Sequence, residues 1–78
     1  MTPAVTVELR EYAVHEDDFG NRVFHYGDSI VVRTFPVTDE STLDALLISA
    51  SKASHYEHKN VAVFFDGKPV CLYLAAKR

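Results

Sequence analysis

The sequence predicts an α+β fold: an antiparallel sheet of four to five strands with one helix packed on one face. Three patterns predict it. Apolar and polar residues alternate near the start of the chain, an apolar stripe with three- and four-residue steps follows Pro36, and two apolar runs flank Asp66 and Gly67. One helix over one sheet face encloses a single core. We therefore expect one domain, residues 1–78, with the element order β-β-(β)-α-β-β.

Residues 4–14 are expected to form the first strand. Val5, Val7 and Leu9 alternate with polar residues, which is the period-two pattern of a half-buried strand. The segment HEDDFGN at residues 15–21 then combines charge with glycine and asparagine, which is typical of a turn.

Residues 22–37 contain two β-rich pieces around the segment YGDS at residues 26–29. Gly27 and Asp28 favour a tight hairpin turn, because glycine accepts the positive φ that such turns require. Alternatively, Gly27 marks a bulge within one long, bent strand. We prefer the hairpin interpretation.

Residues 38–58 are expected to form the helix. Its apolar stripe comprises Leu43, Leu46, Leu47, Ala50 and Ala53. Thr38 is the expected N-cap, with the acidic residues 39 and 40 in the first turn, where the helix dipole favours negative charge. Lysine and histidine gather near the other end, and Asn60 is expected to cap the helix or begin the loop.

The segment VAVFFDGKPVCLYLA at residues 61–75 is expected to form a closing hairpin. Asp-Gly between two apolar runs favours a two-residue turn of the primed type. Pro69 lacks an N–H group, so we expect it at a strand start or facing outward.

Composition narrows the class of protein. The chain of 78 residues has a net charge of −3 and one cysteine. Its beginning predicts no secretory signal, and no apolar run reaches the roughly eighteen residues that cross a bilayer. Cys71 has no partner for an internal disulfide, and a lone thiol suits a reducing compartment, so we expect a cytoplasmic protein. The acidic charge argues against binding duplex DNA or an anionic membrane through bulk charge.

A surplus of aromatic residues is the most informative feature, because one helix covers only one face of the sheet. We expect the strongly apolar residues to face the helix: Val5, Val7, Leu9, Val23, Ile30, Val32, Val61, Val63, Phe65, Val70, Leu72 and Leu74. The opposite face would then carry Arg10, Tyr12, Arg22, Phe24, Tyr26, Val31, Arg33, Phe35, Phe64, Cys71 and Tyr73, with Thr6 and Glu8. Tyrosine, phenylalanine and arginine are typical of the centres of protein interfaces, whereas a solvated face favours threonine, lysine and glutamate. The sequence therefore predicts an interaction surface.

The residues predicted to bind a partner are Arg10, Tyr12, Arg22, Phe24, Tyr26, Arg33, Phe35, Phe64 and Tyr73 on the sheet, and Glu16, Asp17 and Asp18 in the acidic turn. The expected partner is another protein or a second copy of the chain, since small domains often need a partner to complete their core. Alternatively, the acidic side chains imitate phosphates and occupy a partner's basic groove. A further alternative is single-stranded nucleic acid, whose bases stack on rings while arginines hold the phosphates.

The remaining polar motifs do not predict catalysis. His55 and His58 in the segment SHYEHK share a helix face, but the spacing is not that of a zinc helix, and we interpret them as the polar end of the helix. His25 has the parity of the apolar set and is expected to be a hydrogen-bonded core histidine. Ser49 and Lys52 have a Ser-x-x-Lys spacing without its companion motifs. We expect no catalytic, cofactor or metal site and no enzymatic activity.

The layout resembles that of the small acidic inhibitors encoded by bacteriophages and mobile elements, anti-CRISPR proteins among them. It consists of a short leading sheet, the helix at residues 38–58 and the hairpin VAVFFDGKPVCLYL, in a small acidic chain without a catalytic set. The resemblance implies stoichiometric binding to a host defence complex that blocks nucleic-acid loading or nuclease recruitment. It assigns no functional residue. Immunity proteins and subunits of larger assemblies share the layout.

Overall fold

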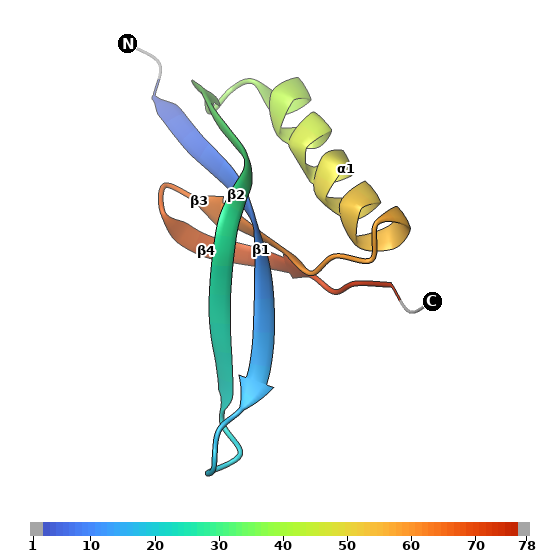
Figure 1. Ribbon diagram of the computed structural model, residues 1–78. Coiled ribbons are helices and arrows are strands. Elements are labelled where there is room, and N and C mark those ends of the chain that lie inside the picture. Colours follow the sequence, from blue (N-terminus) through green and yellow to red (C-terminus); the bar gives the residue numbers. More distant parts are fainter. Residues whose placement is uncertain (1–2, 77–78) are drawn as a thin grey trace.

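A computed structural model of the chain describes residues 3–76, which form four strands and one helix (Figure 1). The elements are β1 (Ala4–Glu16), β2 (Arg22–Pro36), α1 (Glu40–Tyr56), β3 (Val61–Phe65) and β4 (Lys68–Tyr73). The strands form one antiparallel sheet in the order β2-β1-β3-β4. The predicted α+β class is confirmed, with four strands and one helix between β2 and β3.

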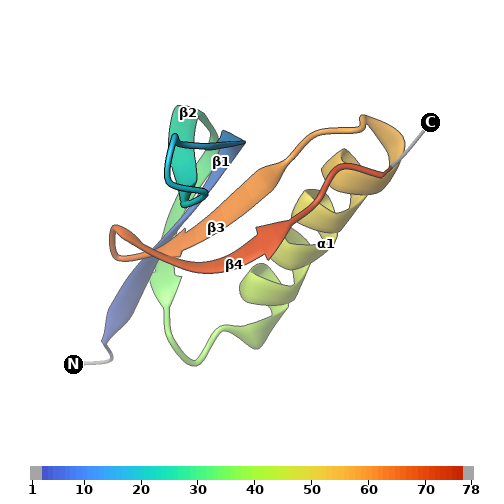
Figure 2. The ribbon, with the colours of Figure 1, turned by 90° about the horizontal axis from the view of Figure 1, so that it is seen from below.

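The core lies between α1 and one face of the sheet. Figure 2 shows α1 beside β3 and β4, on one side of the strands. The residues buried there are Val7, Leu9, Phe35, Leu46, Ala50, Ala53, Val61 and Val63. Leu43 and Leu47 are partly buried against this cluster, so the predicted stripe is the buried side of the helix. We call this cluster the helix-side core.

β2 is a single strand of 15 residues, so the preferred hairpin at YGDS is wrong. Between Tyr12 and Arg10 the register advances two residues on β1, while the partners on β2, Tyr26 and Ser29, are three residues apart. A second extra residue, Ile30, lies between the partners of Arg10 and Leu9. Two bulges therefore bend the strand where a turn was expected. Positive φ occurs at Gly20 and Gly67 among the described glycines, and Gly27 does not adopt the backbone conformation that the hairpin turn needs.

The helix begins one residue later than predicted, and Asp39 rather than Thr38 is its N-cap. The Asp39 carboxylate accepts hydrogen bonds from the Thr42 backbone N–H at 3.1 Å and from the Thr42 hydroxyl at 2.6 Å. These bonds satisfy a backbone donor that the first turn leaves free. At the other end His58 has a φ of 54°, and the N–H groups of Glu57 and Lys59 both donate to the carbonyl of Ala53. The left-handed residue that ends the helix is therefore His58, not Asn60.

The Asp66–Gly67 turn joins β3 to β4 as predicted. Both residues have positive φ, 51° and 84°, which is the geometry of the primed turn. The Asp66 carboxylate accepts from the Thr6 N–H at 2.9 Å, and the Asp66 N–H donates to the Thr6 carbonyl at 2.8 Å. The turn is thus fastened to β1. Pro69 is exposed on β4, which is an edge strand.

β1 and β2 continue well beyond the rest of the sheet. β3 pairs with β1 only over Val7–Glu11, and the last bond to that side runs from the Tyr12 N–H to the Asn60 carbonyl at 3.1 Å. Residues 12–28 project as a two-stranded ribbon, which gives the molecule its long axis of 49 Å against 28 and 16 Å (Figure 1). We call residues 12–28 the arm and the other described residues the body. Within residues 3–76, no helix has the length and apolar character needed to cross a membrane.

Candidate interaction surface

The face of the sheet opposite α1 is the candidate surface. Side chains alternate along a strand, so the neighbours of Val7, Leu9, Val61 and Val63 point away from the helix. With their cross-strand partners they define what we call the uncovered face: Thr6, Glu8, Arg10, Tyr12, Val14, Phe24, Tyr26, Val32, Thr34, Ala62, Phe64 and Leu72. None of the elements that the structure describes lies over this face (Figures 1 and 2).

Four aromatic rings form a connected cluster on the uncovered face: Tyr12, Phe24, Tyr26 and Phe64. Tyr26 meets Phe64 edge to face with ring centroids 4.9 Å apart, and Phe24 stacks beside Tyr26 at 6.4 Å. Tyr12 lies 6.0 Å from Phe24 in a tilted arrangement. Tyr12 and Phe64 are buried at 6% exposure each, whereas Phe24 and Tyr26 are 38% exposed. The buried rings of Tyr12 and Phe64 therefore contribute to packing within the protein, and the half-exposed rings of Phe24 and Tyr26 remain available for contact with a partner.

Burial changes the chemistry of Tyr12. Its hydroxyl donates to the Tyr73 carbonyl at 3.4 Å, across the sheet. Burial raises the pKa of the Tyr12 phenol, and the nearby Tyr26 phenol raises that pKa further. Tyr12 therefore keeps its proton at neutral pH and serves as a structural ring.

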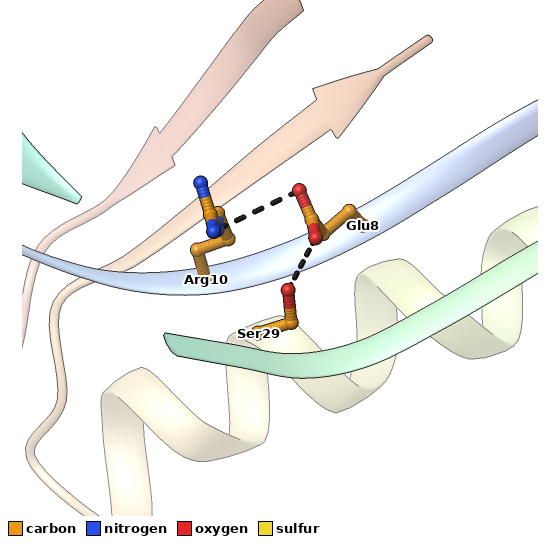
Figure 3. A network of polar contacts seen from close by, with 3 residues as sticks. All are labelled: Glu8, Arg10 and Ser29. Atoms are coloured by element: carbon orange, nitrogen blue, oxygen red, sulfur yellow. Dashed lines mark hydrogen bonds and ion pairs between the residues drawn. The ribbon is translucent and has the colours of Figure 1, made fainter. Parts of the chain in front are cut away.

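Arg10 belongs to a small polar network at the bend of β2 (Figure 3). Its Nε lies 3.6 Å from Glu8 Oε1, and its guanidinium lies over the Phe64 ring at 5.9 Å. The Ser29 hydroxyl donates to the other Glu8 oxygen and joins β1 to β2 beside the bulge. The Glu8 carboxylate therefore contacts both Arg10 and Ser29, and its charge balances that of Arg10.

Three predicted contact residues lie on the wrong side of the sheet. Phe35 pairs with Val5 and is buried in the helix-side core. Arg33 pairs with Val7 and donates from Nη1 to the Val32 carbonyl. Tyr73 is partly buried against the helix-side core, and Val31 and Cys71 also pair with helix-side residues.

Conversely, Val32 and Leu72 were expected under the helix but lie on the uncovered face. Val32 pairs with Glu8 and Leu72 with Ala62. The two bulges in β2 cancel, so Phe24, Tyr26 and Val32 share a face although the segment reads as two separate strands. Val14, which pairs with Phe24, also belongs to this face, and its period-two spacing from Tyr12 could have revealed it.

The other apolar residues expected under the helix are mixed in outcome. Val5 and Phe65 are partly buried against the helix-side core. Ile30, Val70 and Leu74 are exposed, at 42%, 54% and 74%. Ile30 is an extra residue of a bulge, and Val70 occupies the irregularity opposite Val63 and Phe64, so neither keeps the strand alternation.

The acidic turn lies at the tip of the arm. Asp17 has a structural role, because its Oδ1 accepts from the N–H groups of Phe19 at 2.9 Å and Asn21 at 2.8 Å. The bond from Asn21 is the main cause that lowers the pKa of the Asp17 carboxyl. The side chains of Glu16 and Asp18 are exposed. Phe19, which follows Asp18 in the turn, is 89% exposed.

The histidines do not converge on a metal. His58 Nδ1 lies 2.7 Å from the Ala76 carbonyl, and His55 contacts the ring of Tyr56. His25 is exposed and stacks on His15 at 4.8 Å, so its expected place in the core is wrong because it points out from the arm. Among residues 3–76, no group of three or more histidine, cysteine, aspartate or glutamate side chains is placed to hold a metal ion. SHYEHK is thus the end of a helix fastened to the C-terminal segment.

No family model, curated protein or solved structure matches this chain.

Proposed function

We propose that this chain is a non-enzymatic binding protein that engages another protein through the uncovered face. The observation that supports it is the row of half-exposed apolar side chains around the aromatic cluster. Phe24, Tyr26, Val14, Leu72 and Val32 are each between 38% and 46% exposed. Apolar side chains gathered on one face are typical of contact sites.

The face is also well prepared for binding. Its rings are held by strand pairing and by contact with one another, so little side-chain freedom remains to be lost when a partner covers them. The half-exposed Tyr26 lies against the buried Phe64, and the half-exposed Phe24 lies beside Tyr26, which resembles the anchor arrangement of protein interfaces.

Single-stranded nucleic acid is less well supported as the ligand. Of the three arginines that this alternative needs, Arg33 lies on the helix side. Arg10 is paired with Glu8, and Arg22 lies on the arm, which carries four acidic side chains. The phosphate contacts that dominate such binding would have few cations to use.

Binding without turnover is the mode of action that the resemblance to phage-encoded inhibitors implies. A chain of this size would act by occupying a surface that the partner needs for its own assembly or ligand. We propose that the chain inhibits its partner stoichiometrically in this way, with the uncovered face as the contact.

The experiment compares the wild-type protein with a face variant, Phe24→Ser with Tyr26→Ser, in affinity purification from a host lysate. Two exposed helix residues provide the matched control, Ile48→Ser with Tyr56→Ser, because they are 54% and 72% exposed. We expect a bound protein, retained near equimolar ratio by the wild type and the control, to be lost from the face variant. Equal retention by all three would reject the uncovered face as the contact.

The inhibitory role is tested with the captured complex. As the chain is added, the activity of the captured partner complex should fall to a plateau at about one chain per partner complex. No further loss of that activity is expected over time. A continuing, catalytic loss of activity at substoichiometric amounts would contradict binding as the mechanism.

A further inference from the structure

The net charge of the chain is concentrated in the arm. Residues 12–28 contain four acidic side chains, Glu16, Asp17, Asp18 and Asp28, and one basic side chain, Arg22. The other 61 residues of the chain contain seven acidic and seven basic side chains. The arm therefore accounts for the whole net charge of −3, and the remainder is balanced.

Most acidic side chains of the arm take part in no ion pair within the described residues. Within residues 3–76, the ion pairs join Glu8 to Arg10 and Lys59 to Glu11 and Glu57, and none involves Glu16, Asp18 or Asp28. These three side chains are exposed. Asp17 alone is engaged, by the backbone of its own turn.

The arm also carries exposed apolar side chains in one direction. Val14, Phe24 and Tyr26 lie on its uncovered face, and Phe19 stands at its tip with 89% exposure. Its other face bears Ala13 at the base and the stacked His15 and His25. The arm is thus a narrow ribbon with an apolar face and with exposed acidic side chains at its tip and near its base.

We infer that the arm enters a groove of the partner protein, and that this groove has an apolar floor and arginine or lysine side chains along its walls. The inference rests on the proposed function and names the chemistry of the partner. Phe24 and Tyr26 contact the floor, Phe19 leads the tip, and Glu16, Asp18 and Asp28 face the cationic walls. Complementary charge guides association and fixes the orientation of the two surfaces.

The same charge argues against a second copy of the chain as the occupant. Two arms placed face to face would bring two net charges of −3 together, and like charges across an interface oppose association. A body surface of another copy offers no compensating excess of positive charge, because the rest of the chain is neutral.

A random dodecapeptide library displayed on phage tests the inference directly. It is selected against the wild-type protein, against an arm variant with Glu16→Gln, Asp18→Asn and Asp28→Asn, and against a helix control with Glu40→Gln, Asp44→Asn and Glu57→Gln. Each variant removes three exposed carboxylates, and both leave the capping Asp17 and Asp39 intact. Circular dichroism is used to check that each variant is folded.

We expect the wild type and the helix control to enrich the same peptides, which carry several arginine or lysine residues beside aromatic or aliphatic ones. A synthetic peptide from this set should bind the arm variant about tenfold more weakly, because three exposed charge pairs are lost. Its affinity for the wild type should also fall as salt is raised.

Three outcomes would overturn the inference: peptides without net positive charge, basic peptides that bind the arm variant as well as the wild type, or no peptide whose binding depends on the arm. Uncharged peptides whose binding is lost in the Phe24→Ser, Tyr26→Ser variant would reject the basic groove and leave the proposed function standing. Monomers of the wild type in analytical ultracentrifugation are expected, and a salt-resistant dimer lost in that same variant would assign the arm to self-association instead.

Discussion

β1 and β2 run through both the body and the arm, but the two regions differ in how deeply their side chains are buried. In the body, β1 and β2 belong to a four-stranded sheet whose one face is sealed by α1, and eight residues are buried together. In the arm, which the structure describes completely, Tyr12 is the only buried residue. Over the full sequence, the 61 residues outside the arm carry equal numbers of acidic and basic side chains, and the 17 residues of the arm carry a net charge of −3. The body thus holds the helix-side core, and the arm holds exposed apolar and acidic side chains that the proposed contact would use.

The arm depends on the body for its shape. A two-stranded ribbon is at best marginally stable in water on its own. Tyr12 fastens the arm, because its ring joins Phe64 and Ala62 in a second buried cluster and its backbone N–H bonds to Asn60. Burial of Tyr12 against Phe64 and Ala62 of the body therefore offsets the low intrinsic stability of the exposed ribbon.

The largest expected difference between the two regions is in the effect of removing an apolar side chain. Leu9 is 2% exposed in the helix-side core, and Leu9→Ala should destabilise the protein by about 2–5 kcal/mol. Val14 is 41% exposed on the arm, and Val14→Ala should cost less than about 1 kcal/mol. Urea unfolding followed by circular dichroism measures both. Equal losses would mean that the arm contributes to the same core as the body.

The two bends of the sheet should differ next. Gly67 has a φ of 84° in the body turn, so Gly67→Ala places a side chain in the left-handed region and should cost about 1–2 kcal/mol. Gly27 lacks a positive φ, and an added Cβ would meet the Glu11 carbonyl at 3.6 Å, an ordinary contact. Gly27→Ala should therefore leave thermal unfolding almost unchanged. A larger loss at Gly27 than at Gly67 would show that the bulge, not the turn, requires glycine.

The sequence predicts the body well because its local signals agree. The stripe from Leu43 to Ala53 faces the sheet, Asp66–Gly67 forms the expected turn, and Val7 and Leu9 lie in the core. Each of these signals depends on neighbours within a few residues, and the tertiary structure reinforces them.

The arm and the face assignment were harder to predict for a physical reason. YGDS has the composition of a turn, but the chain already reverses at Asp17–Gly20, and β2 gains more by staying paired with β1 along its whole length. The two bulges of β2 cancel, so Val32 and Phe35 keep the faces of one continuous strand, whereas the predicted hairpin exchanged those faces. In β4 one extra residue after Pro69 shifts the register, which places Leu72 on the uncovered face and Tyr73 on the helix side. Bulges depend on pairing between strands, which composition does not reveal. Of the predicted contact residues, Arg10, Tyr12, Phe24, Tyr26 and Phe64 do share one face.

Acid should act on both regions through one capping carboxylate each. The Thr42 hydroxyl and N–H lower the pKa of Asp39 at the start of α1, and the Asn21 and Phe19 N–H groups lower the pKa of Asp17 in the arm turn. A carboxyl with a lowered folded pKa stabilises the fold above its unfolded value near 3.9, and this contribution is lost as pH falls through the folded pKa.

Thermal unfolding between pH 7 and pH 2 measures this loss. Asp39→Asn should lower the midpoint at pH 7 and flatten the decline below pH 4, whereas Asp44→Asn, on the exposed side of the same helix, should change neither. If Asp17→Asn lowered the midpoint as much as Asp39→Asn, the arm turn would be part of the cooperative unit of the body.

The smallest effect is expected at the tip of the arm. Phe19 is 89% exposed, so Phe19→Ser removes almost no buried surface and should change the free energy of unfolding by no more than about 0.5 kcal/mol. Its backbone N–H still donates to Asp17, which keeps the turn closed. A ring that adds nothing to folding should still matter for a partner, so the same variant should weaken binding of the selected basic peptide while the Ile48→Ser control does not. Loss of more than about 1 kcal/mol of stability would mean that the Phe19 ring folds back onto the protein, and the separation of arm from body would then fail at its most exposed residue.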